Sequence, residues 1–318
     1  MKAVTHDLYG GPEVLRVEDV PLPTPRKGQV RVRIRATSVN LSDWEGLTGS
    51  PGYARMGGLR RPRRRTLGSD IAGVVDAVGP GASRFREGDE VYGDNLALMG
   101  GFAEHALAAE SALVAKPAAL SFVQASTIPQ AGAIAVTGTA RTVGGRVLIN
   151  GGGGGSGAFA IQLAKRAGAH VTAVDNATKL DFMRSVGADE VVDYRVEDFT
   201  RITPRFDLVL DLVAHRSVFA YRRALAPGGV YRCVGGSVRT LLRVLTVGWL
   251  AGRLSGRSLG VLVVRQGPSS FTPLAELCVG GEVSIHVHRT YRLDQAAEAL
   301  ADVGEGRALG KVVVEIPA

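Results

Sequence analysis

Three glycines, Gly152, Gly154 and Gly157, have the G-x-G-x-x-G spacing of a turn that binds a diphosphate. At such a turn a Cβ atom would obstruct the tight bend, the approach of the backbone to the phosphates, or the contact between helix and strand. Free N–H groups at the start of the following helix then bind the phosphate oxygens. We therefore predict a dinucleotide site that also includes Gly155 and Ser156, whose hydroxyl is a further donor to the pyrophosphate.

The residues around this turn support the prediction. A buried strand is expected over Val147–Ile149, an amphipathic helix follows the glycines, and a second strand covers His170–Asp175. This second strand ends at an acid about 20 residues beyond the turn, where a dinucleotide-binding unit carries its ribose ligand. The alternative is a flexible linker, because six of the seven residues from Gly151 to Gly157 are glycine. A linker would not lead directly into an amphipathic helix, so we prefer the nucleotide site.

The elements on either side predict two different sheets. In the first third, the alternation of Gln29–Ala36 indicates a strand with one buried face, and Ile71–Val78 and Phe102–Ala106 continue a small antiparallel barrel. From about Ser121 the pattern changes to alternating helices and short apolar strands, which is typical of a parallel sheet. The chain is therefore expected to be α/β, with a β-barrel domain and a doubly wound domain. The further strands and helices that we expect are Glu190–Asp193, Asp207–Val213, Ser217–Ala226, Val230–Val234, Asp294–Val303 and Lys311–Ile316.

The composition excludes several other classes of protein. The 318 residues are 45% hydrophobic and 21% charged, as expected for a globular protein of two domains. The two cysteines, Cys233 and Cys278, lie far apart, so neither a disulfide framework nor a cysteine-based zinc site is expected. The start of the chain lacks the apolar core of a signal peptide, and the most apolar stretch, Leu241–Leu250, is too short to span a membrane. We expect a cytoplasmic protein without a membrane span.

The net charge of the chain is +8, and basic residues are most concentrated in the segment Arg55–Arg65. A nucleic-acid-binding patch is one interpretation, but the segment lacks interleaved aromatic residues and any recognisable nucleic-acid-binding motif. A solvated loop is the simpler interpretation. A third is a loop that borders the cofactor site and attracts anionic ligands. We expect no nucleic-acid partner.

The order of motifs along the chain resembles that of the medium-chain dehydrogenase/reductase superfamily. The motifs are QVRVRIRATSVNLSDWEGLTG, LGSDIAGVVDAVG, FREGDEVYG and VLINGGGGGSGAFAIQLAKRAGAHVTAV. The resemblance implies a GroES-like catalytic domain over residues 1–122, completed by residues 267–318, and a Rossmann domain over residues 123–266. It also implies that the cofactor lies in the cleft between the two domains.

Within that superfamily the chain resembles the zinc-free branch. The zinc alcohol dehydrogenases have Cys at the position of Asn40 and His-Glu at the positions of Ser69 and Asp70, and amide and hydroxyl groups are poor zinc ligands. The resemblance is to quinone oxidoreductases of the ζ-crystallin type and to enone and alkenal reductases. It implies NAD(P)H-dependent hydride transfer to a quinone or an α,β-unsaturated carbonyl, with no bound metal.

The same resemblance implies roles for residues near the nicotinamide. Asn40 matches the asparagine of the S-V-N-x-x-D motif, whose amide holds a cofactor hydroxyl or the substrate oxygen; a simple turn residue is the alternative. Tyr53 lies near the position of an active-site tyrosine in related enzymes, and Asp43 is expected to fix the loop. Ile134 stands where relatives have a threonine beside the nicotinamide, which implies a more apolar substrate pocket or less efficient catalysis.

The choice between the two nicotinamide cofactors rests on three residues. Asp175 favours NADH, because a carboxylate accepts a hydrogen bond from the ribose 2′-hydroxyl and repels a 2′-phosphate. Lys179 and Tyr194 match the residues that bind the 2′-phosphate in the quinone reductase branch, although Lys179 can instead pair with Asp175. We expect NADPH, with NADH as the alternative. The remaining cofactor contacts implied by the resemblance are Val213, Gly235, Gly236 and Lys311.

Two other functions stay open. One is a tailoring reductase of a bulky specialised metabolite, with Ile134 and the apolar Leu241–Val264 region shaping the pocket. The other is a cofactor-binding protein with little turnover. For the enzyme we expect a small-molecule substrate, and family analogy implies a homodimer formed through the edge of the Rossmann sheet.

Overall fold

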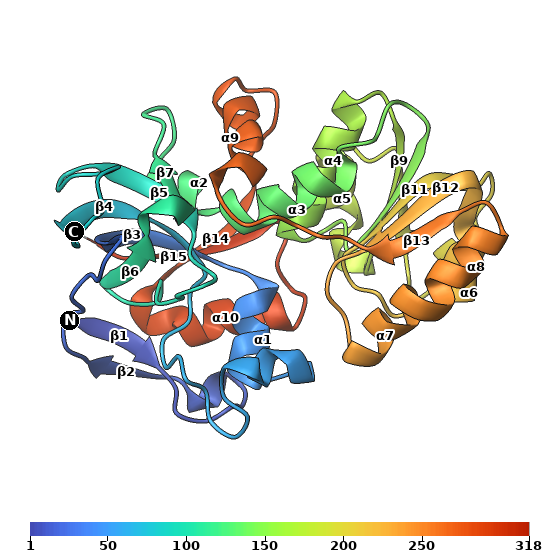
Figure 1. The fold of residues 1–318 in the computed structure, drawn as a ribbon. Coiled ribbons are helices and arrows are strands. Elements are labelled where there is room, and N and C mark those ends of the chain that lie inside the picture. Colours follow the sequence, from blue (N-terminus) through green and yellow to red (C-terminus); the bar gives the residue numbers. More distant parts are fainter. Residues whose placement is uncertain (318) are drawn as a thin grey trace. The chain divides into compact units, whose positions relative to one another are not determined.

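The computed structural model describes residues 1–317, and the chain folds into two compact units (Figure 1). Unit 1 comprises Met1–Ala133 and the C-terminal stretch from Arg265, and unit 2 comprises Ile134–Val264. Helix α3 (Pro129–Thr139) begins in unit 1 and ends in unit 2. The first junction therefore lies inside a helix, whereas the resemblance implies a junction after residue 122.

Unit 1 is built around a largely antiparallel sheet. Its strands follow the order β14-β15-β3-β4-β5-β7, and β6 pairs with β3. The alternating strand β3 (Gln29–Val39) buries Val30, Val32 and Ile34, which confirms the predicted apolar face. The other strands of this unit are β1 (Lys2–Thr5), β2 (Arg16–Asp19), β4 (Asp70–Val78), β5 (Glu90–Asp94), β6 (His105–Ala109), β7 (Leu113–Ala115), β14 (Val287–Arg292) and β15 (Lys311–Glu315). Its remaining α-helices are α1 (Leu41–Thr48), α2 (Phe122–Ser126), α9 (Thr272–Val279) and α10 (Ala296–Gly304).

Unit 2 is a doubly wound parallel sheet, as predicted. Its strands follow the order β10-β9-β8-β11-β12-β13, and every pairing in it is parallel. Numbered along the chain, this is the order 3-2-1-4-5-6 of a dinucleotide-binding fold, with the switch point between β8 and β11. The strands are β8 (Arg146–Asn150), β9 (His170–Asp175), β10 (Glu190–Asp193), β11 (Phe206–Asp211), β12 (Leu225–Cys233) and β13 (Ser258–Val261). The helices are α4 (Gly155–Arg166), α5 (Leu180–Ser185), α6 (Val218–Ala224), α7 (Val238–Arg243) and α8 (Trp249–Leu254), with a π-helical turn at Val244–Gly248.

Several element boundaries differ from the predictions, and three of the differences have a local cause. Strand β6 begins at His105 rather than Phe102, since Phe102 packs into the apolar core of unit 1 ahead of the strand. Helix α6 ends at Ala224, because Leu225 already pairs with Phe206 as the first residue of β12. The helix expected from Asp294 starts with a single 3-10 turn and becomes α-helical only at α10. Among residues 1–317, no helix is both long and apolar enough to cross a membrane.

Candidate functional site

The glycine turn connects β8 to α4 at the carboxyl edge of the parallel sheet. Gly154 immediately precedes the first turn of α4, and no side chain caps that end of the helix. Gly155 is the first helical residue, followed by the half-buried Ser156. Because the first N–H groups of a helix have no partner inside it, the start of α4 presents donors to an anionic ligand.

The three fingerprint glycines are required for different reasons. A Cβ atom at Gly152 would lie 2.8 Å from Sδ of Met183, and one at Gly157 would overlap the carbonyl oxygen of Gly151. A Cβ atom at Gly154 would meet nothing closer than that same carbonyl oxygen, at 3.6 Å. Packing therefore requires glycine at two positions, whereas Gly154 leaves open space, as the approach of a diphosphate requires.

Asp175 ends β9 and turns its carboxylate toward the glycine turn. Oδ2 accepts a hydrogen bond from the backbone N–H of Gly153 at 3.1 Å and lies 3.7 Å from Nζ of Lys179. Lys179 is itself buried, and its side chain passes over Gly153. The structure therefore contains the Asp175–Lys179 ion pair that the sequence left as an alternative.

Tyr194 follows β10 and is exposed, with its backbone N–H bonded to the carbonyl oxygen of Asp175. The guanidinium carbon of Arg195 lies 5.7 Å from the centre of the Tyr194 ring. An exposed aromatic ring and a second cation thus lie beside the carboxyl ends of β9 and β10. The sequence reasoning did not include Arg195, because its neighbour Tyr194 carried the family match.

Asp211, at the end of β11, joins three strand ends in this unit. Its buried carboxylate accepts hydrogen bonds from Nδ2 of Asn150 at 2.8 Å and from Oη of Tyr231 at 2.9 Å. It also accepts from the backbone N–H of Ala214 at 2.8 Å, a residue held at a left-handed φ of 49°. Burial raises the pKa of Tyr231 far above its ordinary value, so its hydroxyl stays a donor. Sequence reasoning missed this tie, which shapes the loop that carries the predicted contact Val213.

The carboxyl edge of the sheet collects the other predicted nucleotide contacts of unit 2. Asp211 and Cys233 are paired as the last residues of β11 and β12, so the loops that follow them start at the same level. The second of these loops contains Gly235 and Gly236, both with positive φ. A hollow lies between the start of α6 and the π-helical turn, and its lining includes His215, Arg216, Phe219, Arg243 and Val247.

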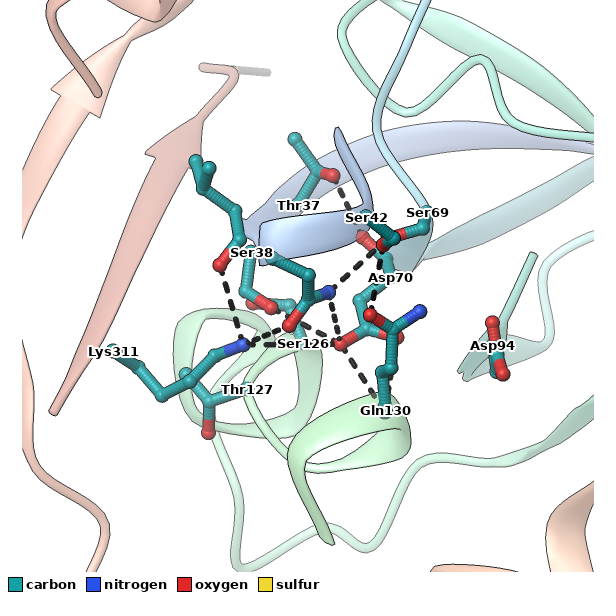
Figure 2. A network of polar contacts seen from close by, with 12 residues as sticks. Thr37, Ser38, Ser42, Ser69, Asp70, Asp94, Ser126, Thr127, Gln130 and Lys311 are labelled. Carbon is teal, nitrogen blue, oxygen red and sulfur yellow. Dashed lines mark hydrogen bonds and ion pairs between the residues drawn. The ribbon is translucent and has the colours of Figure 1, made fainter. Parts of the chain in front are cut away.

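Unit 1 contains a buried polar cluster where β3 ends beside the starts of β4 and β15 (Figure 2). Nδ2 of Asn40 donates to Oδ2 of Asp70 at 2.9 Å and to Oγ of Ser69 at 3.1 Å. Oδ1 of Asn40 accepts from Nζ of Lys311 at 2.6 Å. The structure therefore brings Asn40 and Lys311, which the sequence placed at the cofactor separately, into direct contact.

Asp70 is the most heavily hydrogen-bonded carboxylate of the cluster. It accepts from the backbone N–H of Gln130 at 3.1 Å and from Oγ of Ser38 at 3.2 Å, and Nζ of Lys311 lies 4.0 Å away. Burial raises the pKa of Asp70 to about 8 and lowers the pKa of Lys311. Each of these buried charges thus depends on the other for its ionised form.

Asp43 fixes the loop, as expected from the sequence. Its carboxylate accepts from the backbone N–H groups of Asn40 at 2.8 Å and Gly68 at 3.1 Å, and from Oγ of Ser69 at 3.2 Å. Burial raises its pKa to about 6. The side chain therefore joins the start of α1 to the start of β4.

Gln130 is a member of the cluster that the sequence reasoning overlooked. Its Oε1 accepts from Oγ of Ser42 at 2.8 Å, whereas its Nε2 is buried and has no hydrogen-bond partner among the described residues. A buried donor without a partner costs about 1–3 kcal/mol, so this amide suits an acceptor oxygen on a ligand. The available signal was a single polar residue in the otherwise apolar segment PQAGAIAV.

Tyr53 and Ile134 lie outside this hydrogen-bonded cluster. The hydroxyl of Tyr53 donates to Oε1 of Glu45 on α1 at 3.0 Å, and burial raises the pKa of the phenol far above its ordinary value. Ile134 is half-buried in α3. The hydroxyl of Tyr53 is therefore already committed to a carboxylate.

Comparison with known proteins agrees with both units. Residues 26–118 match the family model of the alcohol dehydrogenase GroES-like domain, and residues 186–314 match that of the zinc-binding dehydrogenases. The chain is 30% identical to the chloroplastic quinone-oxidoreductase QR1 of Triphysaria versicolor, over 99% of this chain and 98% of the relative. It is also 30% identical to the 2-methylene-furan-3-one reductase of Solanum lycopersicum, over 99% of this chain and 79% of the relative. The solved structure of the quinone oxidoreductase from Coxiella burnetii has a TM-score of 0.90, with 29% identity over 100% of this chain and 99% of that one.

The residues at the zinc-ligand positions do not fit the metal that the second family model is named after. Asn40 offers an amide and Ser69 a hydroxyl, and the carboxylate of Asp70 is occupied by the donors described above. Within residues 1–317, no three side chains of His, Cys, Asp or Glu gather in a way that could hold a metal ion. Zinc prefers thiolate, imidazole and free carboxylate ligands, so this donor set is unsuited to it.

Proposed function

The chain belongs to the medium-chain dehydrogenase/reductase superfamily, in its quinone oxidoreductase and enone reductase branch, and from this premise we propose that it reduces quinones or α,β-unsaturated carbonyls with NADPH. The observation that carries the proposal is the uncapped start of α4, with open space at Gly154, at the switch point of the parallel sheet. Relatives that are named for quinone and enone reduction support the substrate class.

A bound nicotinamide cofactor supplies a hydride from C4 of its ring. The backbone around Gly154 would hold its diphosphate, and the loops after β11 and β12, with Val213, Gly235 and Gly236, would hold the part of the cofactor next to the diphosphate. Lys179, Tyr194 and the neighbouring Arg195 favour NADPH, because their charge and donors suit a 2′-phosphate. The carboxylate of Asp175 repels this phosphate less strongly than a free carboxylate would. It already accepts a hydrogen bond from Gly153 and forms an ion pair with Lys179.

The substrate oxygen gains negative charge as the hydride arrives, and hydrogen-bond donors stabilise that charge. We assign this role to Nε2 of Gln130, the buried amide nitrogen without a partner in the described chain. Asn40 has a different role, because Nδ2 already donates twice within the cluster. Its Oδ1 accepts one bond from Lys311 and retains a second lone pair for a cofactor hydroxyl. The hydroxyl of Tyr53 is a further contact for the substrate, once its hydrogen bond to Glu45 is replaced by one to the substrate.

A turnover panel tests this proposal. NADPH oxidation is followed with quinones, alkenals and cyclic enones, and cofactor affinity is measured in parallel from the fluorescence of the reduced nicotinamide. We expect turnover with at least one quinone or activated alkene and saturable binding of NADPH. Tight binding without turnover on the whole panel would favour the cofactor-binding protein. Failure of folded protein to bind either reduced nucleotide would overturn the proposal.

The hollow in unit 2 favours a second candidate, a tailoring reductase of a bulky substrate. Its lining combines Arg216 and Arg243 with Phe219, Val244 and Val247, the last two from the apolar region that the sequence singled out. Such a lining suits an extended apolar molecule that carries an anionic group. A strong preference for bulky anionic enones over simple quinones in the same panel would select this candidate.

A further inference from the structure

A further carboxyl group faces the buried polar cluster of unit 1 from the end of β5. Asp94 is the last residue of this strand, and it lies opposite Asp70 of β4 in the strand pairing. Residues that lie opposite each other in an antiparallel pair place their side chains on the same face of the sheet. Asp94 is therefore a neighbour of Asp70, which itself accepts from the backbone N–H of Gln130.

Only one oxygen of Asp94 is engaged in a hydrogen bond. Oδ1 accepts from the backbone N–H of Leu96 at 2.9 Å, whereas Oδ2 has no hydrogen-bond partner among residues 1–317. Figure 2 shows Asp94 apart from the hydrogen-bonded network, on the side to which Nε2 of Gln130 points. Two polar atoms without a partner in the described chain, Nε2 of Gln130 and Oδ2 of Asp94, thus border the same part of unit 1.

The charges around Asp94 favour its protonated form. Asp43, Asp70 and Asp94 are three carboxyl groups, and in the described part of the chain Lys311 is the one cation that pairs with any of them. Like charges this close oppose each other's ionisation. Strand β7 and helix α2, which also pack against β5, contain no ionisable side chain that could offset this effect. Burial also raises the pKa of Asp94 above its ordinary value.

The other acids of the region are less able to give a proton to a substrate. Asp70 and Asp43 are fully buried, and hydrogen bonds from the chain occupy both carboxyl groups. The phenol of Tyr53 donates to Glu45 instead. Asp94 is only half-buried, so its free oxygen can exchange a proton with water.

We propose that Asp94 is the proton donor of the reduction, which acts together with the amide of Gln130. This inference rests on the proposed function. The substrate accepts a hydride with its electron pair, and negative charge develops on a carbonyl oxygen beside Nε2 of Gln130. This oxygen takes the proton from Oδ2 of Asp94, so that one O–H bond forms as the other breaks. The product is an enol or a hydroquinone, and the carboxylate of Asp94 regains a proton from water.

The variant Asp94→Asn tests this role, because the amide oxygen can still accept from Leu96 while the acidic proton is lost. On a substrate that the wild type reduces, kcat should fall about a hundredfold. Saturable binding of NADPH, followed by its fluorescence, should not change. The matched control is Glu87→Gln, an exposed carboxyl group just before β5, which should leave both quantities unaltered.

A second pair of variants separates the proton from the shape of the side chain. Asp94→Glu and Asp94→Gln are equal in size, and only the first retains an acid. We expect the glutamate variant to be at least tenfold faster than the glutamine variant. A purely structural role for Asp94 would make the two variants equally slow.

The ionisation of Asp94 can be measured without any substrate. In protein with ¹³C-labelled aspartate carboxyl groups, the resonance that disappears in Asp94→Asn belongs to this residue. We expect it to titrate at a higher pH than that of Asp19, whose exposed carboxyl has its pKa lowered by Lys2. Circular dichroism and the melting temperature confirm that each variant is folded.

Three results would overturn the inference, and they differ in what they say about the proposed function. Wild-type turnover with an unchanged kcat in Asp94→Asn would remove Asp94 from the mechanism and leave the reductase activity established. Titration of Asp94 at or below the pH at which Asp19 titrates would show that it has no proton to give near neutral pH. Absence of wild-type turnover with every quinone and enone of the panel would overturn this inference and the proposed function together.

Discussion

The ammonium nitrogen of Lys311 lies 2.6 Å from Oδ1 of Asn40, although the two residues are 271 positions apart. The contact joins the first residue of β15 to the residue that precedes α1. Asp70 faces the opposite end of the same amide, so the oxygen of Asn40 turns toward the cation and its nitrogen toward the carboxylate. The orientation of the amide is therefore set by two buried ionisable groups.

Replacement of Lys311 by methionine should remove this control. The variant leaves the buried Asp70 without its cation, and we expect a loss of about 3 kcal/mol in the free energy of unfolding, measured in urea at pH 9, where Asp70 is ionised. The control is Lys2→Met, which removes an exposed ion pair with Asp19 and should cost less than about 1 kcal/mol. Equal losses in the two variants would show that Lys311 does not stabilise a buried charge.

The stability of the protein should depend on pH through Asp70. Burial raises its pKa from 3.8 to about 8, so between these values the folded chain binds a proton that the unfolded chain has released. This contribution to stability is fully present below the unfolded pKa and is lost as the pH rises through the folded pKa. In Asp70→Asn, the unfolding free energy should fall less steeply with pH over this range. The slope should be reduced by up to the amount that one bound proton contributes.

The exposed carboxyl of Asp19 is the control for this titration. Its pKa is lowered by Lys2, so Asp19→Asn should leave the slope above pH 4 unchanged, measured by urea unfolding at a series of pH values. Parallel curves for wild type and Asp70→Asn across the whole range would contradict the raised pKa. They would mean that Lys311 keeps Asp70 ionised.

Two alanine substitutions in the glycine turn should affect different properties, cofactor binding in one case and fold stability in the other. Gly154→Ala enters open space at a φ of −87°, so it should change stability by about 1 kcal/mol at most and weaken cofactor binding about tenfold or more. Gly157→Ala meets the carbonyl of Gly151 and should destabilise the fold by about 2 kcal/mol. Cofactor titration and thermal unfolding of both variants distinguish these effects. Normal cofactor affinity in Gly154→Ala would place the diphosphate elsewhere.

Gln130→Leu should impair turnover without impairing cofactor binding. Loss of the amide removes a donor to the substrate oxygen, and kcat should fall about a hundredfold. Ser42→Ala, which removes only the partner of Oε1, should have a smaller effect. Steady-state kinetics and cofactor titration on both variants give the comparison, and an unchanged kcat in Gln130→Leu would remove this residue from the mechanism.

Cofactor preference should shift when the Asp175–Lys179 pair is broken. Asp175→Ser removes a negative charge near the 2′-position and frees the ammonium of Lys179, so kcat/KM for NADPH should rise about tenfold relative to NADH. Lys179→Met should shift the ratio toward NADH. The control Asp181→Ser, at a fully exposed carboxylate, should not alter it. A wild-type preference for NADH above tenfold would contradict the proposed use of NADPH.

Local patterns in the sequence were sufficient for the parallel sheet. The predicted strands His170–Asp175 and Glu190–Asp193 match β9 and β10 residue for residue, because a buried parallel strand is a continuous apolar run between polar ends. The glycine fingerprint was equally local as a signal, since its three glycines lie within six consecutive residues of one turn. The alternation in Gln29–Ala36 predicted the buried face of β3 for the same reason.

The polar cluster of unit 1 had no such local signature. Asn40, Asp70, Gln130 and Lys311 come from four separate segments, and strand pairing alone brings β3, β4 and β15 together. A buried lysine and a buried carboxylate look like surface residues in a sequence, because their partners are far away along the chain. The role of Asp211 was hidden in the same way.

The tie that Asp211 forms has a thermodynamic consequence for ligand binding. The loop after β11 is ordered by the protein's own hydrogen bonds, through Ala214, Asn150 and Tyr231. A nucleotide that reaches this edge meets a surface whose conformational entropy was lost when the chain folded. Binding at this end of the ligand therefore costs little loop entropy, because the loop after β11 is already ordered. The free energy of each new contact can then contribute to the affinity.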